Sequence, residues 1–277
     1  MKRILLANDL TERSIDALAR ATRLAARDGA TLRIVHVANG NSAAAGAQTP
    51  QQHLRHQAQV VAERFAEHDV DISITVRSGH PDTVLTDEAR KFGADLVVVG
   101  THGAPSLCDA IFGTTAMHLA RTAPCPILIV QMSGELDHRR AMVAVDDPMK
   151  AEHLLRHTVD VAPDAELITI HAYQSTLVQR MNHIDIGNAI QLEQQLAVRQ
   201  ILRETCSEAV ARRCRVVVRE GDMMAVLMNS WSQIEPELVA IETRGRSLVC
   251  GSLTQALLLG CTSDILVTRT DSRIEPE

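Results

Sequence analysis

The sequence predicts an α/β protein built from two tandem, doubly wound domains, each with a five-stranded parallel sheet. Three observations lead to this prediction: strand and helix patterns alternate, the strand patterns are continuously apolar, and the second half of the chain repeats the first. Continuously apolar, β-branched runs are typical of strands covered on both faces, as in a parallel sheet. Alternating strands and helices joined by right-handed crossovers wind such a sheet doubly.

The first half contains five strand patterns separated by four helix patterns. Strands are expected at 3–7, 31–37, 72–77, 95–99 and 127–131. Helices are expected where apolar residues recur at helical spacing, at 11–27, 51–68, 81–92 and 114–122. Thr11 is placed to cap the first helix, and Pro81 lies in the first turn of the third. In the second half, the same spacing predicts one amphipathic helix from about Asn188 to Arg213.

The chain contains an internal repeat. Three segments of the first half align without gaps on the second: 74–100 on 216–242, 30–36 on 165–171, and 7–9 on 144–146. A tandem duplication of this length indicates two domains, which we expect at 1–133 and 140–270 with a linker near 132–140. Each domain is large enough to bury its own core.

Charge and composition argue against several classes of function. The chain has 28 Lys and Arg against 34 Asp and Glu, a net charge of -6, so it offers no overall basic field to nucleic acid. One Trp, one Tyr and three Phe leave few rings for stacking on bases. No apolar stretch is long enough for a membrane span and none at the start reads as a signal peptide, so we expect a cytoplasmic protein without membrane contact. The six cysteines are scattered without a C-x-x-C pair, which indicates reduced, structural thiols.

The region from 95 to 115 carries the most specific pattern in the chain. An apolar strand ends at Gly100, Gly103 follows, and Gly113-Thr114-Thr115 opens the next helix. Glycine lets a ligand approach the backbone closely, and the first turn of a helix offers unpaired N–H groups to an anion. The pattern therefore indicates a phosphate site at the carboxyl ends of the strands, the edge at which Asp9 and Val37 are also expected.

The spacing Gly-x2-Gly-x9-Gly-Thr, together with the strands around it, resembles the nucleotide-binding signature of the universal stress protein family. The resemblance covers residues 1 to about 131. It implies a Rossmann-like, adenine nucleotide alpha hydrolase-like fold and a regulatory role in the stress response. It also implies that the first domain binds ATP, or ADP or AMP, with Mg2+ carried by the phosphates and no metal held by the protein itself.

By the same resemblance, the nucleotide site comprises residues from three strand ends and one helix start. Asp9 and Val37 would contact the base and ribose, the first two glycines would let the nucleotide pass closely, and the helix start would hold the phosphates. The full set is Ala7, Asp9, Val37, Gly100, His102, Gly103, Gly113, Thr114 and Thr115. Asp9 has a second interpretation as the cap of the following helix. His36 and its counterpart His171 are interpreted as hydrogen-bonded structural residues.

The sequence shows no catalytic residue at this site. The Gly-x4-Gly-Lys-Ser/Thr motif is absent, and so is a Gly-x-Gly-x-x-Gly after a strand. We therefore expect a protein that holds nucleotide and is not an enzyme, or hydrolyses ATP weakly at most. Two alternatives remain: an interaction module that binds no nucleotide, and a slow ATPase.

The second half departs from the signature, so we expect it not to bind ATP. Its strand 238–241 is expected to end at Glu242, which takes the place of Gly100, and the following loop is four residues shorter. A glutamate would bring negative charge to the place of the phosphates. Arg244 and Arg246 leave open another anionic ligand, an ion pair with Glu242, or a solvated loop.

The last strands of the two halves are expected to pair with each other. Family members commonly associate in this way, so the resemblance implies that Ile127–Val130 and Ile265–Val267 could pair within one chain. The result would be an intramolecular pseudo-dimer of domains, which could itself form a homodimer. An unidentified regulatory protein would then sense whether nucleotide is bound.

Overall fold

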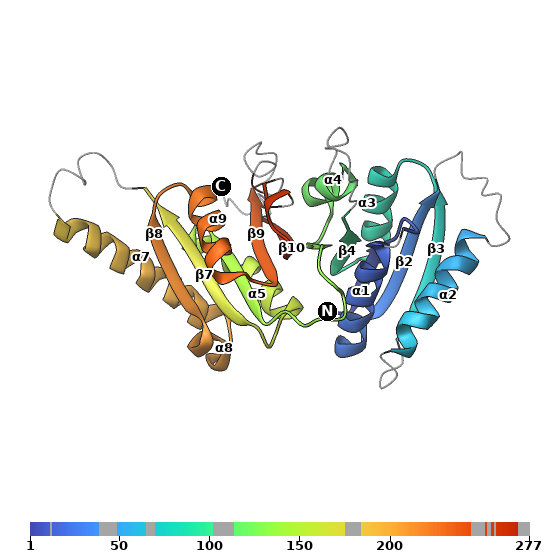
Figure 1. The fold of residues 1–277 in the computed structure, drawn as a ribbon, viewed down its shortest axis with the longest axis horizontal. Helices are drawn as coiled ribbons and strands as arrows, with labels where there is room; N and C mark the ends of the chain where they lie inside the picture. The colour runs from blue at the N-terminus through green and yellow to red at the C-terminus, as the bar shows by residue number, and fades with distance from the viewer. Residues whose placement is uncertain are drawn as a thin grey trace, which may run out of the picture. The chain divides into compact units, whose positions relative to one another are not determined.

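The computed structural model describes residues 1–11, 13–38, 49–64, 70–101, 114–174, 184–244, 253, 256–257 and 259–270. The chain divides into two compact units. Unit 1 consists of Met1–Asp137 and Asp264–Arg269, and unit 2 contains the chain from His138 to Ser263. Figure 1 labels the elements of both units, and each is described by itself.

Unit 1 contains a parallel sheet with strand order β3-β2-β1-β4-β5. Its strands are β1 (Arg3–Ala7), β2 (Thr31–Ala38), β3 (Ile72–Ser78), β4 (Leu96–Gly100) and β5 (Ile127–Val130). Its helices are α1 (Arg13–Asp28), α2 (Pro50–Glu63), α3 (Pro81–Phe92) and α4 (Thr114–Thr122). Helices α1 and α2 pack together, as do α3 and α4, so the sheet is covered on both faces. This arrangement confirms the predicted doubly wound α/β class.

A sixth strand, β10 (Asp264–Thr270), joins unit 1 from the end of the second repeat. It runs antiparallel to β5, with Ile265 opposite Ile129 and Val267 opposite Ile127. The pairing of the two closing strands that the sequence predicts is therefore present. Because β10 belongs to unit 1, the last strand of the second repeat completes the sheet of the first.

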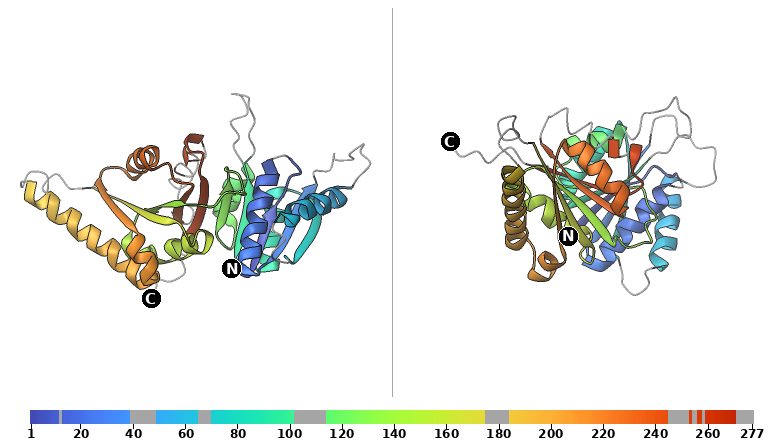
Figure 2. Two further views of the ribbon diagram at one scale, coloured as in Figure 1. Left: turned by 60° about the horizontal axis from the view of Figure 1, so that its bottom comes forward. Right: turned by 60° about the vertical axis from the view of Figure 1, so that its left-hand side comes forward.

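Unit 2 contains four parallel strands in the order β9-β6-β7-β8. They are β6 (Arg140–Val145), β7 (Glu166–Tyr173), β8 (Arg215–Glu220) and β9 (Leu238–Arg244). The helical elements are η1 (Pro148–Lys150), α5 (Glu152–Val161), α7 (Ile184–Thr205), α8 (Glu208–Arg213) and α9 (Met223–Ile234). Helices α5 and α7 pack together, and α9 packs on β6 and β7 from the other side, as the left view of Figure 2 shows.

Two predictions in the second half are wrong in detail. The helix expected from Asn188 to Arg213 is two helices, because Ser207 caps a new one: its hydroxyl accepts a hydrogen bond from the backbone N–H of Val210 at 3.4 Å. Strand β9 continues to Arg244, so Glu242 lies inside the strand instead of following it. The buried neighbours Ile241 and Thr243 show that this extension is part of the packed sheet.

A buried ion pair ties β10 to α1. The Nε atom of Arg20 lies 3.2 Å from Oδ2 of Asp264, and the two residues are 3% and 0% exposed. The other carboxylate oxygen of Asp264 accepts hydrogen bonds from the backbone N–H groups of Gln131 and Met132, at 2.8 and 2.9 Å. Burial lowers the pKa of the Arg20 guanidinium, and the neighbouring Asp264 carboxylate opposes that shift.

The cysteines in the described part of the chain have weakly acidic thiols. Cys125, Cys206, Cys214 and Cys261 form no disulfide. Burial raises the pKa of Cys125 to about 12 and the pKa values of Cys214 and Cys261 to about 11. Only the thiolate is nucleophilic, so these side chains behave as packing groups. Cys108 and Cys250 lie outside the described residues.

Replacing Asp264 with Asn should destabilise unit 1 by about 3 kcal/mol, because the Arg20 charge would stay buried without a counterion. The side-chain oxygen of the introduced Asn would still accept a backbone hydrogen bond, so the loss of stability would measure the effect of the missing negative charge. Adding Arg20→Met should recover much of the stability. Urea unfolding followed by circular dichroism tests this. Asp87→Asn, which removes an exposed i,i+3 partner of Arg90, is the control and should change stability by less than about 0.5 kcal/mol. Equal stability of Asp264→Asn and the parent would contradict the prediction.

Iodoacetamide at pH 8 should alkylate Cys125, Cys214 and Cys261 about 100-fold more slowly in the folded protein than in urea, because a raised pKa lowers the thiolate fraction. Mass spectrometry of the digested protein measures the rate at each cysteine. Rapid labelling of any of the three in the folded state would show that its thiol is accessible and ionised.

Candidate functional site

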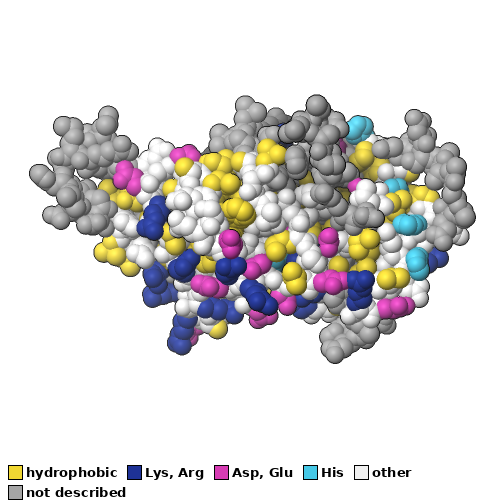
Figure 3. All heavy atoms as spheres, viewed as in Figure 1, with side chains coloured by type: hydrophobic (Ala, Val, Ile, Leu, Met, Phe, Trp, Pro, Cys, Tyr) yellow, Lys and Arg dark blue, Asp and Glu magenta, His cyan; other side chains and the backbone are white. Residues whose placement is uncertain are grey.

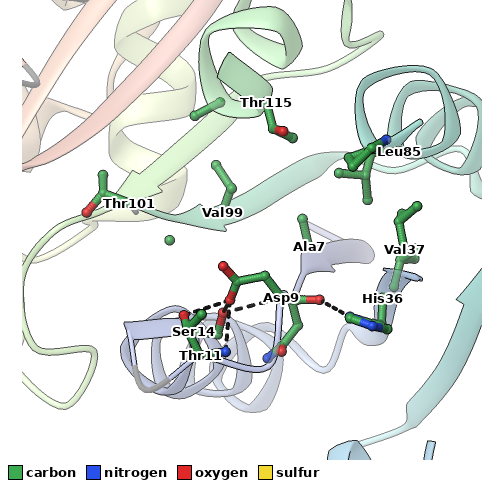
Figure 4. Close-up of a pocket in the computed structure, with 15 residues that line it drawn as sticks. Ala7, Asp9, Thr11, Ser14, His36, Val37, Leu85, Val99, Thr101 and Thr115 are labelled. Atoms are coloured by element: carbon green, nitrogen blue, oxygen red, sulfur yellow. Dashed lines mark hydrogen bonds between the residues drawn. The ribbon is translucent and has the colours of Figure 1, made fainter. Parts of the chain in front are cut away.

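A cavity of about 320 Å³ lies in unit 1 at the carboxyl ends of β1, β2 and β4. Figure 4 shows it between the turn after β1, the end of β2, and helices α3 and α4. Five of the nine predicted site residues line it: Ala7, Asp9, Val37, Gly100 and Thr115. Parallel strands β1, β2 and β4 are neighbours in the sheet, so their carboxyl ends bring together residues that are about 100 positions apart in sequence.

The cavity has an apolar part and a polar part. Val37 from β2, Leu85 from α3 and Val99 from β4 supply apolar walls. The polar groups include the hydroxyl side chains of four residues at strand ends and helix starts, which are Thr11, Ser14, Thr101 and Thr115. Such a division suits a ligand with a flat apolar portion and a polar, hydroxyl-bearing portion.

Asp9 organises the turn between β1 and α1. One of its carboxylate oxygens accepts hydrogen bonds from the N–H of Thr11 at 3.0 Å, the hydroxyl of Thr11 at 2.7 Å, and the hydroxyl of Ser14. The next residue, Leu10, has φ +67°, which is an uncommon conformation for a residue with a side chain. The backbone N–H of Leu10 donates to the Asn8 side chain at 2.8 Å, which helps to hold it there. Figure 4 shows the Asp9 side chain at the cavity together with Thr11 and Ser14.

The two interpretations of Asp9 are thus compatible in one structure. Its carboxylate bonds stabilise the start of α1, as a cap would, and the same residue lines the cavity. Non-glycine residues at positive φ occur often at binding sites, where the surrounding structure holds the strain. In unit 2 the counterpart of Leu10 is Asp147, which has φ -126° and caps η1 by accepting from the N–H of Met149 at 3.0 Å. The strained turn therefore belongs to the first repeat.

The remaining predicted residues cannot be placed at the cavity. His102, Gly103 and Gly113 lie outside the described residues. Thr114 is the first residue of α4, but its side chain is outside the described set. The predicted phosphate contacts of these four residues stay a prediction.

Several lining residues were missed by the sequence analysis. Pro81 and Leu85 come from α3, and Asn8, His36 and Ala116 flank predicted positions. The interpretation of His36 as a hydrogen-bonded residue is confirmed, since its Nδ1 lies 2.9 Å from the carbonyl oxygen of Asn8. Its counterpart His171 likewise contacts the carbonyl of Val145, at 2.7 Å. A carbonyl only accepts, so Nδ1 donates in both. The one available signal for α3 was Pro81, which marks a helix start beside a strand end.

The described residues include no metal centre and no membrane helix. No three His, Cys, Asp or Glu side chains among them come together in a way that could hold a metal ion. None of the helices in the described part of the chain has the length and hydropathy of a membrane span.

Comparison with known proteins finds one family across the chain. A family model described as the universal stress protein family matches residues 1–131 and 138–269. Universal stress protein A homolog 1 of Coxiella burnetii is 31% identical over 140 residues, which are 47% of this chain and 96% of that protein. Universal stress protein Rv2005c of Mycobacterium tuberculosis is 25% identical over 189 residues, 64% of this chain and 62% of that protein.

A solved structure shares the fold over nearly the full chain. The crystal structure of a protein from Pseudomonas aeruginosa UCBPP-PA14, described as a universal stress protein, has a TM-score of 0.68 at 19% identity. The match covers 98% of this chain and 94% of that one. At this identity the likeness concerns the fold alone. The family model, however, matches both repeats and with them most of the sequence, and the chain therefore belongs to the universal stress protein family.

Proposed function

We propose that unit 1 binds an adenine nucleotide in the cavity at the ends of β1, β2 and β4, and that occupancy of this site regulates a partner protein during stress. The observation that carries the proposal is the meeting of Asp9, Val37, Gly100 and Thr115 at one cavity. These residues come from four separate elements, and the sequence pattern had assigned all of them to one nucleotide site.

The shape and chemistry of the cavity support this ligand class. A volume of about 320 Å³ is within the range of small-molecule sites. The base would lie against Val37, Leu85 and Val99, and the ribose would lie near Asp9. The phosphates would extend toward the start of α4 at Thr114, where a helix N-terminus favours negative charge. Hydroxyl and carboxylate oxygens are suitable ligands for Mg2+, which would arrive on the phosphates.

The residues that line the cavity favour a protein that holds the nucleotide and does not hydrolyse it. None of the described residues that line the cavity is Lys, Arg or Cys. The Nδ1 atom of His36 is engaged by the Asn8 carbonyl, and one oxygen of Asp9 is engaged by Thr11 and Ser14.

In unit 2 we propose that the equivalent place does not hold a nucleotide. Glu242 replaces Gly100 and lies half-buried within β9, which extends two residues past the position where β4 ends. The longer strand and its carboxylate would occupy the path that Gly100 leaves to the ligand, and the negative charge would repel phosphates.

Calorimetric titration of the nucleotide-free protein with Mg-ATP should give one site per chain. Thr115→Val, which removes one hydroxyl from the cavity at nearly constant volume, should weaken binding about fivefold to tenfold. Thr83→Val makes the same change at an exposed position of α3 outside the cavity and should bind like the parent. No binding at millimolar ATP would reject the proposal in favour of a nucleotide-free interaction module. Two sites per chain would contradict the expectation for unit 2.

Asp9→Ala should have two effects, because Asp9 both holds the turn and lines the cavity. The free energy of unfolding should fall by about 1 to 2 kcal/mol through loss of the cap. Mg-ATP affinity, measured at a temperature where the variant is fully folded, should fall at least about tenfold. Loss of stability with unchanged affinity would leave Asp9 as a cap only and remove it from the proposed site.

A further inference from the structure

Unit 2 has a groove of about 700 Å³ between its edge strand β8 and helix α9. Arg215, Val217 and Arg219 line it from β8, and Asn229, Ser230 and Gln233 line it from α9. The three β8 residues alternate along the strand and so share one face of the sheet. Within the described residues, strand β8 pairs with β7 alone, so its other edge is unpaired.

The internal repeat shows that the charges of this groove are arranged differently in the two units. In unit 1, the counterpart of Arg219 is Arg77, whose Nε lies 2.9 Å from the carboxylate of Glu88, a side chain that is 6% exposed. In unit 2, Ser230 occupies the place of Glu88, and Asn229 occupies the place of another acid, Asp87. The helix that faces the strand therefore lacks two carboxylates, and Gln233 replaces Lys91 on it. The turn before the helix carries Glu220 and Asp222, where unit 1 has Ser78 and His80.

The other arginine of the groove lies on the edge strand of unit 2, whereas the arginine at the matching place in unit 1 lies on an inner strand. In unit 1, Arg33 of the inner strand β2 lies over the ring of Phe92, 4.1 Å from its centroid, and faces Ser73 across the sheet. In unit 2, the equivalent pair is Ile168 and Arg215, and Ile234 replaces the phenylalanine. The guanidinium thus lies on the edge strand and has no aromatic partner at the equivalent position.

Both arginines of the groove are exposed and available. Neither guanidinium has an ion-pair, hydrogen-bond or ring partner among the described residues. In unit 1, Arg77 forms an ion pair with Glu88, and Arg33 lies over the ring of Phe92. Figure 3 shows dark-blue side chains over β8 and the neighbouring α8, with magenta acidic side chains between them. Strand β8 therefore presents two arginines without internal partners to the groove, and the two acids of the lining lie beyond Arg219.

We propose that this groove binds an extended, acidic segment of a partner protein, which adds to β8 as a further strand. An edge strand offers backbone hydrogen bonds to an extended segment, and pockets for alternate side chains select its sequence. Arg215 and Arg219 are four residues apart on the strand, which corresponds to about 13 Å. Carboxylates at positions 1 and 5 of the added strand match this spacing, and an apolar residue at position 3 faces Val217.

Two acidic residues at one end of the groove limit where the carboxylates of the bound segment can lie. Glu220 and Asp222 line the groove beyond Arg219. The Asp222 carboxylate caps α9 by accepting a hydrogen bond from the backbone N–H of Ala225 at 3.2 Å. They would repel a carboxylate placed past Arg219. The charges therefore favour one register of an acidic segment along β8, with its acids opposite the two arginines.

The test uses the full chain and a labelled peptide, Thr-Glu-Thr-Val-Thr-Glu-Thr with blocked ends, in fluorescence anisotropy at low salt. The parent protein should bind this peptide at least about tenfold more tightly than a control peptide in which Gln replaces both Glu residues. Arg219→Glu should weaken binding of the acidic peptide about tenfold or more. Arg203→Glu makes the same charge change on α7, outside the groove, and should alter binding less than about twofold.

Amide hydrogen exchange provides a second measurement. Binding by charge attraction alone, without strand addition, would not change it. Bound peptide should slow exchange in Arg215–Glu220, and a peptide with Pro in place of Val should lose both the protection and the affinity. Equal binding of the acidic peptide and its Gln twin, or equal losses in Arg219→Glu and Arg203→Glu, would overturn the proposal. So would a single-stranded RNA that protects β8 where the peptide does not. None of these outcomes depends on the nucleotide site in unit 1.

Discussion

The buried pair of Arg20 and Asp264 constrains how β10 joins the rest of unit 1. It joins a helix near the start of the chain to a strand near its end, with both charges almost completely removed from water. Desolvating two charges is costly, so such a pair is stable only when its other hydrogen-bonding groups are satisfied. Asp264 meets this condition through the N–H groups of Gln131 and Met132, and Arg20 through the carbonyl oxygens of Ser133 and Leu136.

The same network requires a glycine in the segment that follows β5. A Cβ atom on Gly134 would lie 2.0 Å from the carbonyl oxygen of Asp16 and 2.6 Å from the backbone nitrogen of Arg20. Both contacts are with backbone atoms of α1, which cannot move away as a flexible side chain could. The chain leaving β5 thus runs directly against α1, close enough for the carbonyls of its residues to accept from Arg20 and Arg23.

The two repeats show how one fold can be adapted in different directions. In the first, a strained turn at Leu10 and a strand that stops at Gly100 leave a cavity at the strand ends. In the second, the turn is relaxed and the strand carrying Glu242 continues to Arg244. Arg77 and Arg33 of unit 1 have internal partners, whereas their counterparts on β8 have none among the described residues. The two proposed binding surfaces thus lie on different repeats.

The sequence alone determined the α/β class, the duplication and the strand ends that form the cavity, because apolar periodicity and turn residues are local signals. Helix α3 has the predicted bounds, since Pro81 starts it and Gly93 ends it with φ +62°. The break at Ser207 has a local cause, a serine cap, which the amphipathic pattern running across it hides. Only the tertiary structure decided the length of β9, which depends on packing. It also decided which arginines find partners, because an ion pair such as Arg20 with Asp264 joins residues whose proximity no local pattern encodes.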